Sequence, residues 1–157
     1  MKDQVILSEL DRRILAALQA DSRLSNQELA DQIGSSPSSV WRRVRVMEQA
    51  GIIDGFRLSV SAEMLGWSET VLVHVSLNTH SDESTRAFTE LVENAPEVLE
   101  CYAVTGEHDY LLKVLATDMR SYYRFLEGAL MSKGFISRTS STVVMSKIKE
   151  TGQVPVR

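Results

Sequence analysis

Residues 25–51 read SNQELADQIGSSPSSVWRRVRVMEQAG, and this stretch predicts two short helices joined by a tight turn. Ser25 and Glu28 form a capping-box pattern, in which each side chain accepts a backbone N–H of the other residue, so a helix begins near Asn26. Gly34 ends this helix, because glycine tolerates the left-handed conformation that a helix end often needs. A helix, a tight turn and a second helix are the plan of a helix-turn-helix unit that binds DNA.

The second helix of this stretch is predicted from Pro37 to about Ala50. Ser36 is a good N-cap, proline suits the first helical position, and Gly51 ends the helix. Its two faces differ in polarity. The apolar side chains at i, i+4 and i+7 form the buried face: Val40, Val44 and Met47. The opposite face and its flanks carry polar, basic and aromatic side chains: Ser38, Trp41, Arg42, Arg43, Arg45 and Gln49.

A face of Arg, Ser and Gln suits the major groove of DNA, because arginine can bind guanine through two hydrogen bonds and serine or glutamine can contact base edges or phosphates. We predict that Arg42 and Arg45 face the groove, and that Arg43 and the Ser38 hydroxyl contact phosphates. The DNA-binding candidates are Ser36, Ser38, Ser39, Trp41, Arg42, Arg43, Arg45 and Gln49. The alternative interpretation is a solvated basic face on an ordinary core helix.

Two further elements complete the N-terminal half. Ser8 and Asp11 repeat the capping-box pattern and predict a helix over residues 9–20, which packs across the other two. Residues 52–60 combine an aliphatic pair, an Asp-Gly turn signal and an alternation of apolar and polar residues that is typical of a strand. We expect a short strand pair here, a wing beside the DNA-binding helix, so that residues 1–60 form a winged helix-turn-helix domain.

The second half predicts a sheet covered by two helices. The expected elements are strand 70–77, helix 84–93, strand 98–105, strand 110–116, helix 118–132 and strand 136–149. This order is the split βαβ, ferredoxin-like arrangement, in which right-handed crossovers place both helices on one face of a four-stranded sheet. The other face carries Leu72, His74 and Ser76, and its mixed apolar character predicts packing against a second copy of the chain.

The predicted fold class is therefore α+β with two domains. Residues 61–68 form the hinge, residues 69–151 the ferredoxin-like domain, and residues 152–157 a loose tail. The net charge of −4 lies wholly beyond residue 60, because residues 1–60 hold eight basic and eight acidic side chains. A locally basic helix on an acidic body predicts modest, salt-sensitive non-specific DNA binding.

Composition and motifs argue against an enzyme. The single cysteine forms no intrachain disulfide, and His74, His80 and His108 are too scattered to suggest a metal site or a catalytic base. No nucleophile elbow, phosphate loop or paired-carboxylate signature occurs. We predict no catalytic residue, no metal and no cofactor. The absence of a signal peptide and of an apolar run near the roughly 20 residues of a membrane span predicts a cytoplasmic protein with no membrane partner.

The loop Gly106-Glu107-His108-Asp109-Tyr110 is the most informative site of the second half. One interpretation is a hairpin turn in which the glycine supplies a special dihedral angle. The other is a ligand loop, since exposed backbone N–H groups can hold a carboxylate and Asp109 can hold an ammonium group. An amino acid carries both charges, so one loop suits both of its ends.

Segments in both halves carry a resemblance to a known family: 10–15, 25–30, 41–44, 51–53, 104–114 and 139–145. Together, in this order and spacing, they resemble the leucine-responsive/asparagine-regulator (Lrp/AsnC, feast/famine) family from Leu7 to about Thr151. The chain departs from the family pattern at two positions. Ser35 stands where relatives usually place an aliphatic residue, and Val46 stands where a basic residue is common.

The resemblance implies a transcriptional regulator with an N-terminal winged helix-turn-helix and a C-terminal ferredoxin-like, ACT-like sensing domain. Its expected partners are double-stranded DNA, further copies that form dimers and usually octamers, and a small effector, typically an amino acid, bound between dimers near the glycine-aspartate loop. Carried over by position, the effector-binding candidates are Gly106, Asp109, Tyr110, Met119, Thr142, Val143 and Val144. The alternative hypothesis is a metabolite-sensing module that regulates an enzyme partner by protein–protein contact, with its N-terminal helices as the contact surface.

Overall fold

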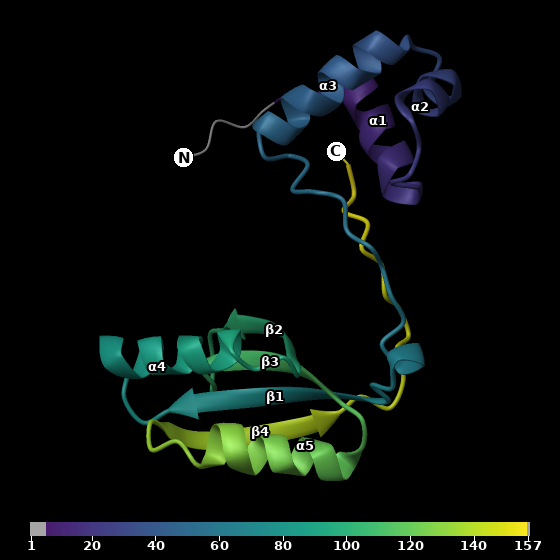
Figure 1. The fold of residues 1–157 in the computed structure, drawn as a ribbon. Helices are drawn as coiled ribbons and strands as arrows, with labels where there is room; N and C mark the ends of the chain where they lie inside the picture. Colours follow the sequence, from purple (N-terminus) through teal and green to yellow (C-terminus); the bar gives the residue numbers. More distant parts are fainter. Residues whose placement is uncertain (1–5, 157) are drawn as a thin grey trace. The chain divides into compact units, whose positions relative to one another are not determined.

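The computed structural model describes residues 6–156, which fold into two compact units (Figure 1). The first unit comprises the described residues up to Ser59 together with those from Lys149 onward, and the second runs from Val60 to Ile148. The chain therefore passes between the units twice, once after Ser59 and once after Ile148. No helix in this described range is long and apolar enough to cross a membrane.

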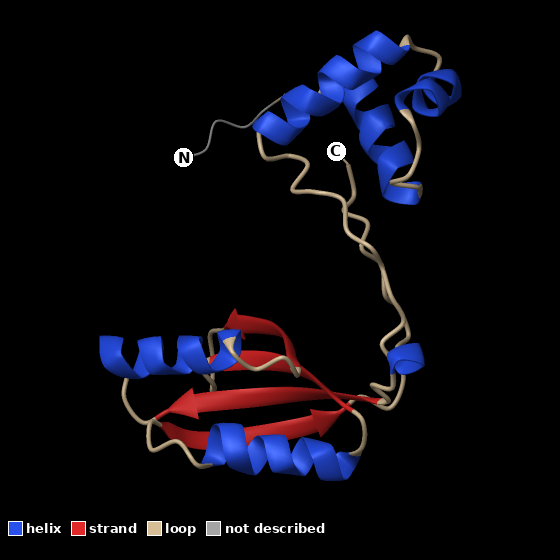
Figure 2. Ribbon diagram, viewed as in Figure 1, coloured by secondary structure: helices blue, strands red, loops and turns tan. Residues whose placement is uncertain are grey.

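Within the described part of the first unit, three helices surround one core: α1 (Glu9–Ala20), α2 (Asn26–Ile33) and α3 (Pro37–Gln49) (Figure 2). The predicted N-caps begin each helix: Ser8 with Asp11, Ser25 with Glu28, and Ser36, whose hydroxyl accepts the Ser39 N–H. Gly34 ends α2 with a φ of 63°, in the left-handed region that the turn requires. The core is built from apolar residues of all three helices: Ile14, Ala17, Leu29, Ala30, Ile33, Val40 and Met47.

The predicted strand pair of the wing is wrong, because residues 52–60 form no strand in this structure. The backbone N–H groups of Ile52 and Ile53 instead donate to the Met47 carbonyl, at 2.9 and 3.2 Å. Both isoleucine side chains pack against the three-helix core. Their N–H groups cap the end of α3 and are not available to a strand ladder, so the aliphatic pair belongs to the helix terminus.

The C-terminal segment also differs from the loose tail that was expected. The side-chain amide of Gln19 in α1 donates to the Val154 carbonyl at 3.0 Å and accepts the Val154 N–H at 2.6 Å. The side chain of Gln153 donates to the Gln19 carbonyl at 3.2 Å. These hydrogen bonds attach Gln153 and Val154 to α1, a contact that no local pattern in the sequence indicates.

The second unit confirms the ferredoxin-like order. Its elements are η1 (Glu63–Leu65), β1 (Glu69–Leu77), α4 (Asp82–Glu93), β2 (Val98–Ala103), β3 (Tyr110–Ala116), α5 (Met119–Phe125), the π-helical η2 (Leu126–Met131) and β4 (Ile136–Val143). The described strands form one antiparallel sheet in the order β2-β3-β1-β4. Because β1 and β3 are central, their alternating side chains set the composition of both faces of the sheet.

Helices α4 and α5 cover one face of the sheet, and both run roughly along the direction of the strands in Figure 1. The buried side chains of β1 point to this face: Val71, Val73, Val75 and Leu77. The helices contribute Phe88, Tyr122 and Phe125, and η2 contributes Leu130. The alternate side chains of β1 are only half-buried and lie on the open face: Leu72, His74 and Ser76. The period of two along β1 thus separates a closed core from a face that one chain leaves uncovered.

Phe88 is a fully buried side chain of the helix-covered core, with 1 % of its surface exposed. Phe88→Ala is expected to lower the free energy of unfolding by about 3–5 kcal/mol, because it removes apolar burial and leaves a cavity. Urea denaturation followed by circular dichroism measures this loss. Glu90→Ala, at an exposed position of the same helix, is the control and should stay within about 0.5 kcal/mol of the parent. Equal losses in the two variants would contradict the packing of α4 described above.

Candidate DNA-binding surface and effector site

Helix α3 presents one exposed and one buried stripe. The exposed stripe carries Ser38, Trp41, Arg42, Arg45 and Gln49. On the other side Val40 and Met47 are fully buried. Two of the three remaining candidates lie near the start of the helix, where Ser36 is exposed and Ser39 is half-buried. The structure therefore brings most of the predicted DNA-binding side chains onto one accessible surface.

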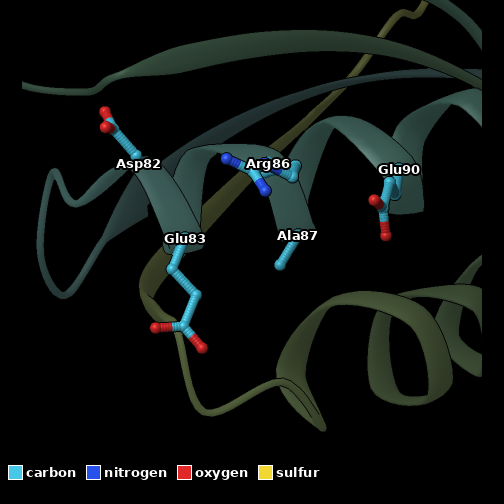
Figure 3. Close-up of a pocket in the computed structure, with 5 residues that line it drawn as sticks. All are labelled: Asp82, Glu83, Arg86, Ala87 and Glu90. Carbon is cyan, nitrogen blue, oxygen red and sulfur yellow. The ribbon is translucent and has the colours of Figure 1, made fainter.

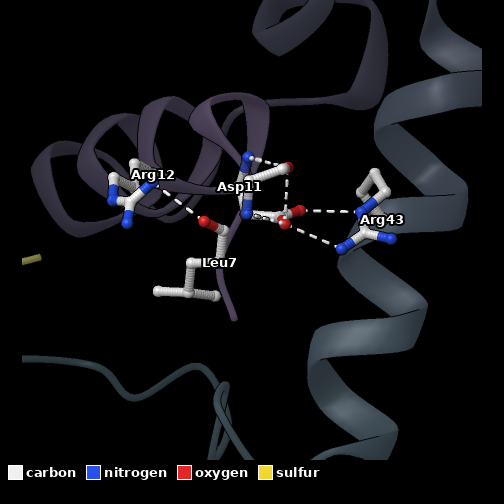
Figure 4. A network of polar contacts seen from close by, with 5 residues as sticks. Leu7, Asp11, Arg12 and Arg43 are labelled. Atoms are coloured by element: carbon white, nitrogen blue, oxygen red, sulfur yellow. Dashed lines mark hydrogen bonds and ion pairs between the residues drawn. The ribbon is translucent and has the colours of Figure 1, made fainter. Parts of the chain in front are cut away.

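Arg43 has a different environment from its neighbours on α3. Its Nε and Nη2 atoms each donate to a different carboxylate oxygen of Asp11 in α1, both at 2.7 Å (Figure 4). The Asp11 side chain is fully buried, and the backbone N–H and hydroxyl of Ser8 donate to the same carboxylate at 2.8 and 2.6 Å. The sequence analysis predicted that Arg43 contacts a phosphate. In the structure its guanidinium binds Asp11 instead and joins α3 to α1.

The buried charge of the Asp11 carboxylate depends on the hydrogen bonds from Arg43 and Ser8. A buried charge without partners is costly, and here four donated hydrogen bonds offset the lost hydration. The hydrogen bonds from Arg43, and after them those from Ser8, hold the pKa of Asp11 at about 2 against the opposing effect of burial. The same contact raises the pKa of Arg43. Beside it, Arg12 donates to the Leu7 carbonyl at 2.8 Å, which secures the chain entering α1 (Figure 4).

The loop between β2 and β3 is held by several contacts. Gly106 has a φ of 120°, which favours glycine. Asp109 donates its backbone N–H to the Val75 carbonyl at 3.0 Å, and its Oδ2 accepts the Leu77 N–H at 2.8 Å. Its Oδ1 lies 3.6 Å from Nε2 of His80, a largely exposed side chain. One oxygen of Asp109 is therefore structural, and the other faces an exposed residue that sequence reasoning did not select.

The remaining loop residues contact neighbouring strands. Glu107 forms an ion pair with Arg138 of β4 at 2.8 Å. His108 accepts or donates a hydrogen bond with the Ser76 hydroxyl at 3.2 Å, and its ring lies 4.9 Å from that of His74. Tyr110 packs on Phe88, with ring centroids 4.3 Å apart. These contacts hold the loop against the sheet, so the surface of the loop is formed without a ligand.

The effector candidates fall into two groups within one chain. Tyr110 pairs with Val75, near one end of β1, beside Gly106 and Asp109. Val143 pairs with Val71, four residues away along β1, which is about 13 Å. Thr142, Val144 and Met119 belong to that far end: Thr142 pairs with Leu72, the Val144 N–H donates to the Thr70 carbonyl, and the half-exposed Met119 begins α5 just after β3. The strand register separates residues that the family resemblance presents as one set.

A shallow hollow lies on α4 and is lined by Asp82, Glu83, Arg86, Ala87 and Glu90 (Figure 3). None of these residues is an effector candidate. The hollow is lined by residues of one helix only, so no second element closes it into the kind of concave pocket that holds small ligands. Across the described residues, no group of His, Cys, Asp and Glu side chains is placed to hold a metal ion.

Comparison with protein families gives two matches that together span most of the chain. The family described as "Winged helix-turn-helix DNA-binding" matches residues 7–54. The family described as "Lrp/AsnC ligand binding domain" matches residues 70–154. The boundary between the matches lies in the segment that connects the two compact units.

Individual relatives match over nearly the full length. The transcriptional regulator AzlB of Bacillus subtilis is 40% identical over 152 residues, covering 97% of each chain. The leucine-responsive regulatory protein of Escherichia coli K12 is 34% identical over 151 residues, covering 96% of this chain and 92% of that protein. Among solved structures, a transcriptional regulator of Neisseria meningitidis in complex with L-methionine has a TM-score of 0.91 at 34% identity, covering 96% of this chain and 97% of that one.

The Asp11–Arg43 contact predicts a specific pH dependence of stability. Since folding depresses the pKa of Asp11 to about 2, the contact stabilises the fold above the unfolded-state pKa near 4, and this contribution is lost as the pH falls towards 2. Between pH 6 and pH 2 the parent chain should therefore lose about 2 kcal/mol more than Asp11→Asn. Urea denaturation at a series of pH values measures the difference. Arg43→Met should flatten the profile in the same way, and parallel profiles for all three proteins would contradict the assignment.

Proposed function

Since the chain belongs to the Lrp/AsnC family of transcriptional regulators, we propose that it regulates transcription by placing α3 in the major groove of double-stranded DNA. The observation that carries this proposal is the exposed polar stripe of α3, on a helix that Arg43 fixes to α1. We assign no catalytic residue, metal or cofactor to the protein. A regulator of this kind acts where the DNA is, which in a bacterium is the cytoplasm.

The roles of the DNA-binding residues follow from their positions on α3. Arg42 and Arg45 donate to guanine edges, because both guanidinium groups are exposed on the side opposite the core. Gln49 continues the same stripe. The serines at the start of the helix, Ser36, Ser38 and Ser39, contact phosphates, which a helix N-terminus favours. Arg43 acts indirectly, by orienting the helix through Asp11.

The open face of the sheet supports assembly of at least a homodimer. Its half-buried β1 side chains leave apolar surface uncovered in one chain, and Leu58 and Met145 in the connecting segments are 88% and 98% exposed. A second copy that covers these surfaces brings two α3 helices to one duplex, on half-sites about one helical turn or a multiple apart. We assign residues 1–60 to DNA binding, 61–68 to the hinge and 69–151 to assembly and effector binding, with octamers as the full assembly.

We further propose that a small effector, an amino acid, binds where two copies meet. The loop with Gly106, Asp109 and Tyr110 lies at one end of the sheet, and Met119 with the end of β4 lies at the other. A site that uses both groups needs the loop of one copy and the β4 end of another. An effector bound there changes DNA binding by stabilising one assembly over others, since only differential affinity shifts a population.

The groove assignment predicts that Arg42→Ala with Arg45→Ala weakens binding to the DNA upstream of its own gene by at least about thirtyfold, because two base-reading contacts are lost. A gel-shift titration measures the affinity. The matched control is Arg120→Ala with Arg124→Ala, which removes two exposed charges from α5. If the α3 pair binds as well as the parent, or if both pairs weaken binding equally, the groove assignment is wrong.

The effector assignment predicts a loss of response in Asp109→Asn, which keeps an acceptor for the Leu77 N–H but removes the negative charge. A thermal-shift screen of the twenty amino acids on the parent first identifies a ligand, because a ligand at about 100 times its Kd adds roughly 2.7 kcal/mol of stability. L-methionine, bound by the Neisseria relative, is the first ligand to test. Asp109→Asn and Asp109→Ala should both abolish the shift, and Glu107→Gln should retain it. An undiminished shift in Asp109→Asn would refute the role of the carboxylate.

A further inference from the structure

Trp41 and Arg45 form a contact on the exposed stripe of α3. The Trp41 side chain is half-exposed, and the guanidinium carbon of Arg45 lies 5.6 Å from the centroid of its ring. Nη1 of Arg45 also lies 3.9 Å from the carboxylate of Glu48. The guanidinium therefore has an aromatic ring and a carboxylate as neighbours, all on consecutive turns of one helix.

The position of Trp41 is not explained by the core of the first unit. Apolar residues on the opposite side of α3 supply that core, while the indole stands among Ser, Arg and Gln side chains. In the major groove, the C5 methyl group of thymine is the base feature that an apolar side chain recognises. An indole at this place offers such a surface with only two rotatable side-chain bonds to order.

The position of Arg45 favours a base edge over a phosphate. The indole restricts the guanidinium before DNA binds, so less side-chain entropy is lost when two parallel hydrogen bonds form. The nearby Glu48 carboxylate repels a phosphate, which carries a full negative charge, more strongly than the guanine edge, whose two acceptors carry only partial charges. None of the ion pairs of the described residues joins Arg42 to a carboxylate. The preference for a base edge therefore applies to Arg45 and not to Arg42.

We propose that Trp41 and Arg45 act as one specificity-determining pair: the indole contacts the methyl group of a thymine, while Arg45 donates to O6 and N7 of a guanine one or two base-pair steps away. The spacing supports this, since 5.6 Å between the two groups lies between one step of about 3.4 Å and two such steps. The inference rests on the proposed function, because it requires α3 to lie in the major groove.

The test alters single atoms of the DNA. Binding sites are selected from a random duplex library with the full-length parent protein, and each thymine of the selected site is then replaced by deoxyuridine, which lacks only the C5 methyl. At one thymine per half-site the parent should bind about fourfold more weakly, the effect of one buried methyl group. Trp41→Ala should bind the unmodified site about as weakly as the parent binds the deoxyuridine site. Its affinity should not change further when deoxyuridine replaces that thymine.

The guanine contact is tested in the same way with 7-deazaguanine, which lacks the N7 acceptor. The parent should lose affinity at a guanine one or two steps from the sensitive thymine, and Arg45→Ala should show no further loss there. Trp41→Phe keeps an aromatic face, so it should remain partly sensitive to deoxyuridine and to 7-deazaguanine. This variant is the control for a general effect of side-chain truncation on α3.

The outcomes separate this inference from the proposed function. If the parent selects a defined site, but every deoxyuridine substitution affects the parent and Trp41→Ala equally, the pair is refuted while groove binding stands. If the sensitive guanine lies more than two steps from the sensitive thymine, the pair is likewise refuted. If the parent selects no sequence at all, the proposed function and this inference both fall.

Discussion

The contact between Asp11 and Arg43 orients α3 so that its DNA-binding side chains are exposed. It joins α1 to α3 through two hydrogen bonds of 2.7 Å to a fully buried carboxylate, and loss of the Arg43 partner would leave that buried charge without its counter-ion. Because successive helical residues are 100° apart, an inward Arg43 turns its neighbour Arg42 outward and places Arg45 on the same accessible side. The ion pair and the buried side chains of Val40 and Met47 together fix the rotation of the helix about its axis.

The same contact changes the electrostatics of DNA binding. The three arginines of α3 suggest a strongly basic helix, yet Asp11 neutralises one of them internally. Arg42 and Arg45 remain for DNA in a chain whose net charge is −4. A single copy therefore has little non-specific attraction to phosphates, and useful affinity requires several helices acting on one duplex. In the assembly that we propose, the acidic second unit supplies that multiplicity.

The second unit shows what a loop motif and a family resemblance indicate about a candidate ligand site. The loop at Gly106 and the end of β4 at Val143 were both selected from the sequence, and both lie at accessible ends of the sheet. The register of β1 with its neighbours then pairs Tyr110 and Val143 with positions of β1 that are four residues, or about 13 Å, apart along that strand. His80, which approaches Asp109, comes from the segment before α4 and carried no sequence signal. Strand register and loop contacts arise from pairing between distant segments, so a linear pattern does not contain them.

The sequence by itself determined the helices and their caps, the polar and apolar faces of α3, and the order of strands and helices in the second unit. These features depend on residues within about four positions of one another, through capping hydrogen bonds and the periods of 3.6 and 2. Only the tertiary structure decided that Arg43 pairs with Asp11, 32 residues earlier, that Ile52 and Ile53 cap α3 in place of a wing strand, and that Gln19 holds the C-terminal segment. Each of these contacts joins groups that come close only when separate elements pack. A buried charge or N–H group needs a hydrogen-bond partner, and the packing of the elements decides which partner is near.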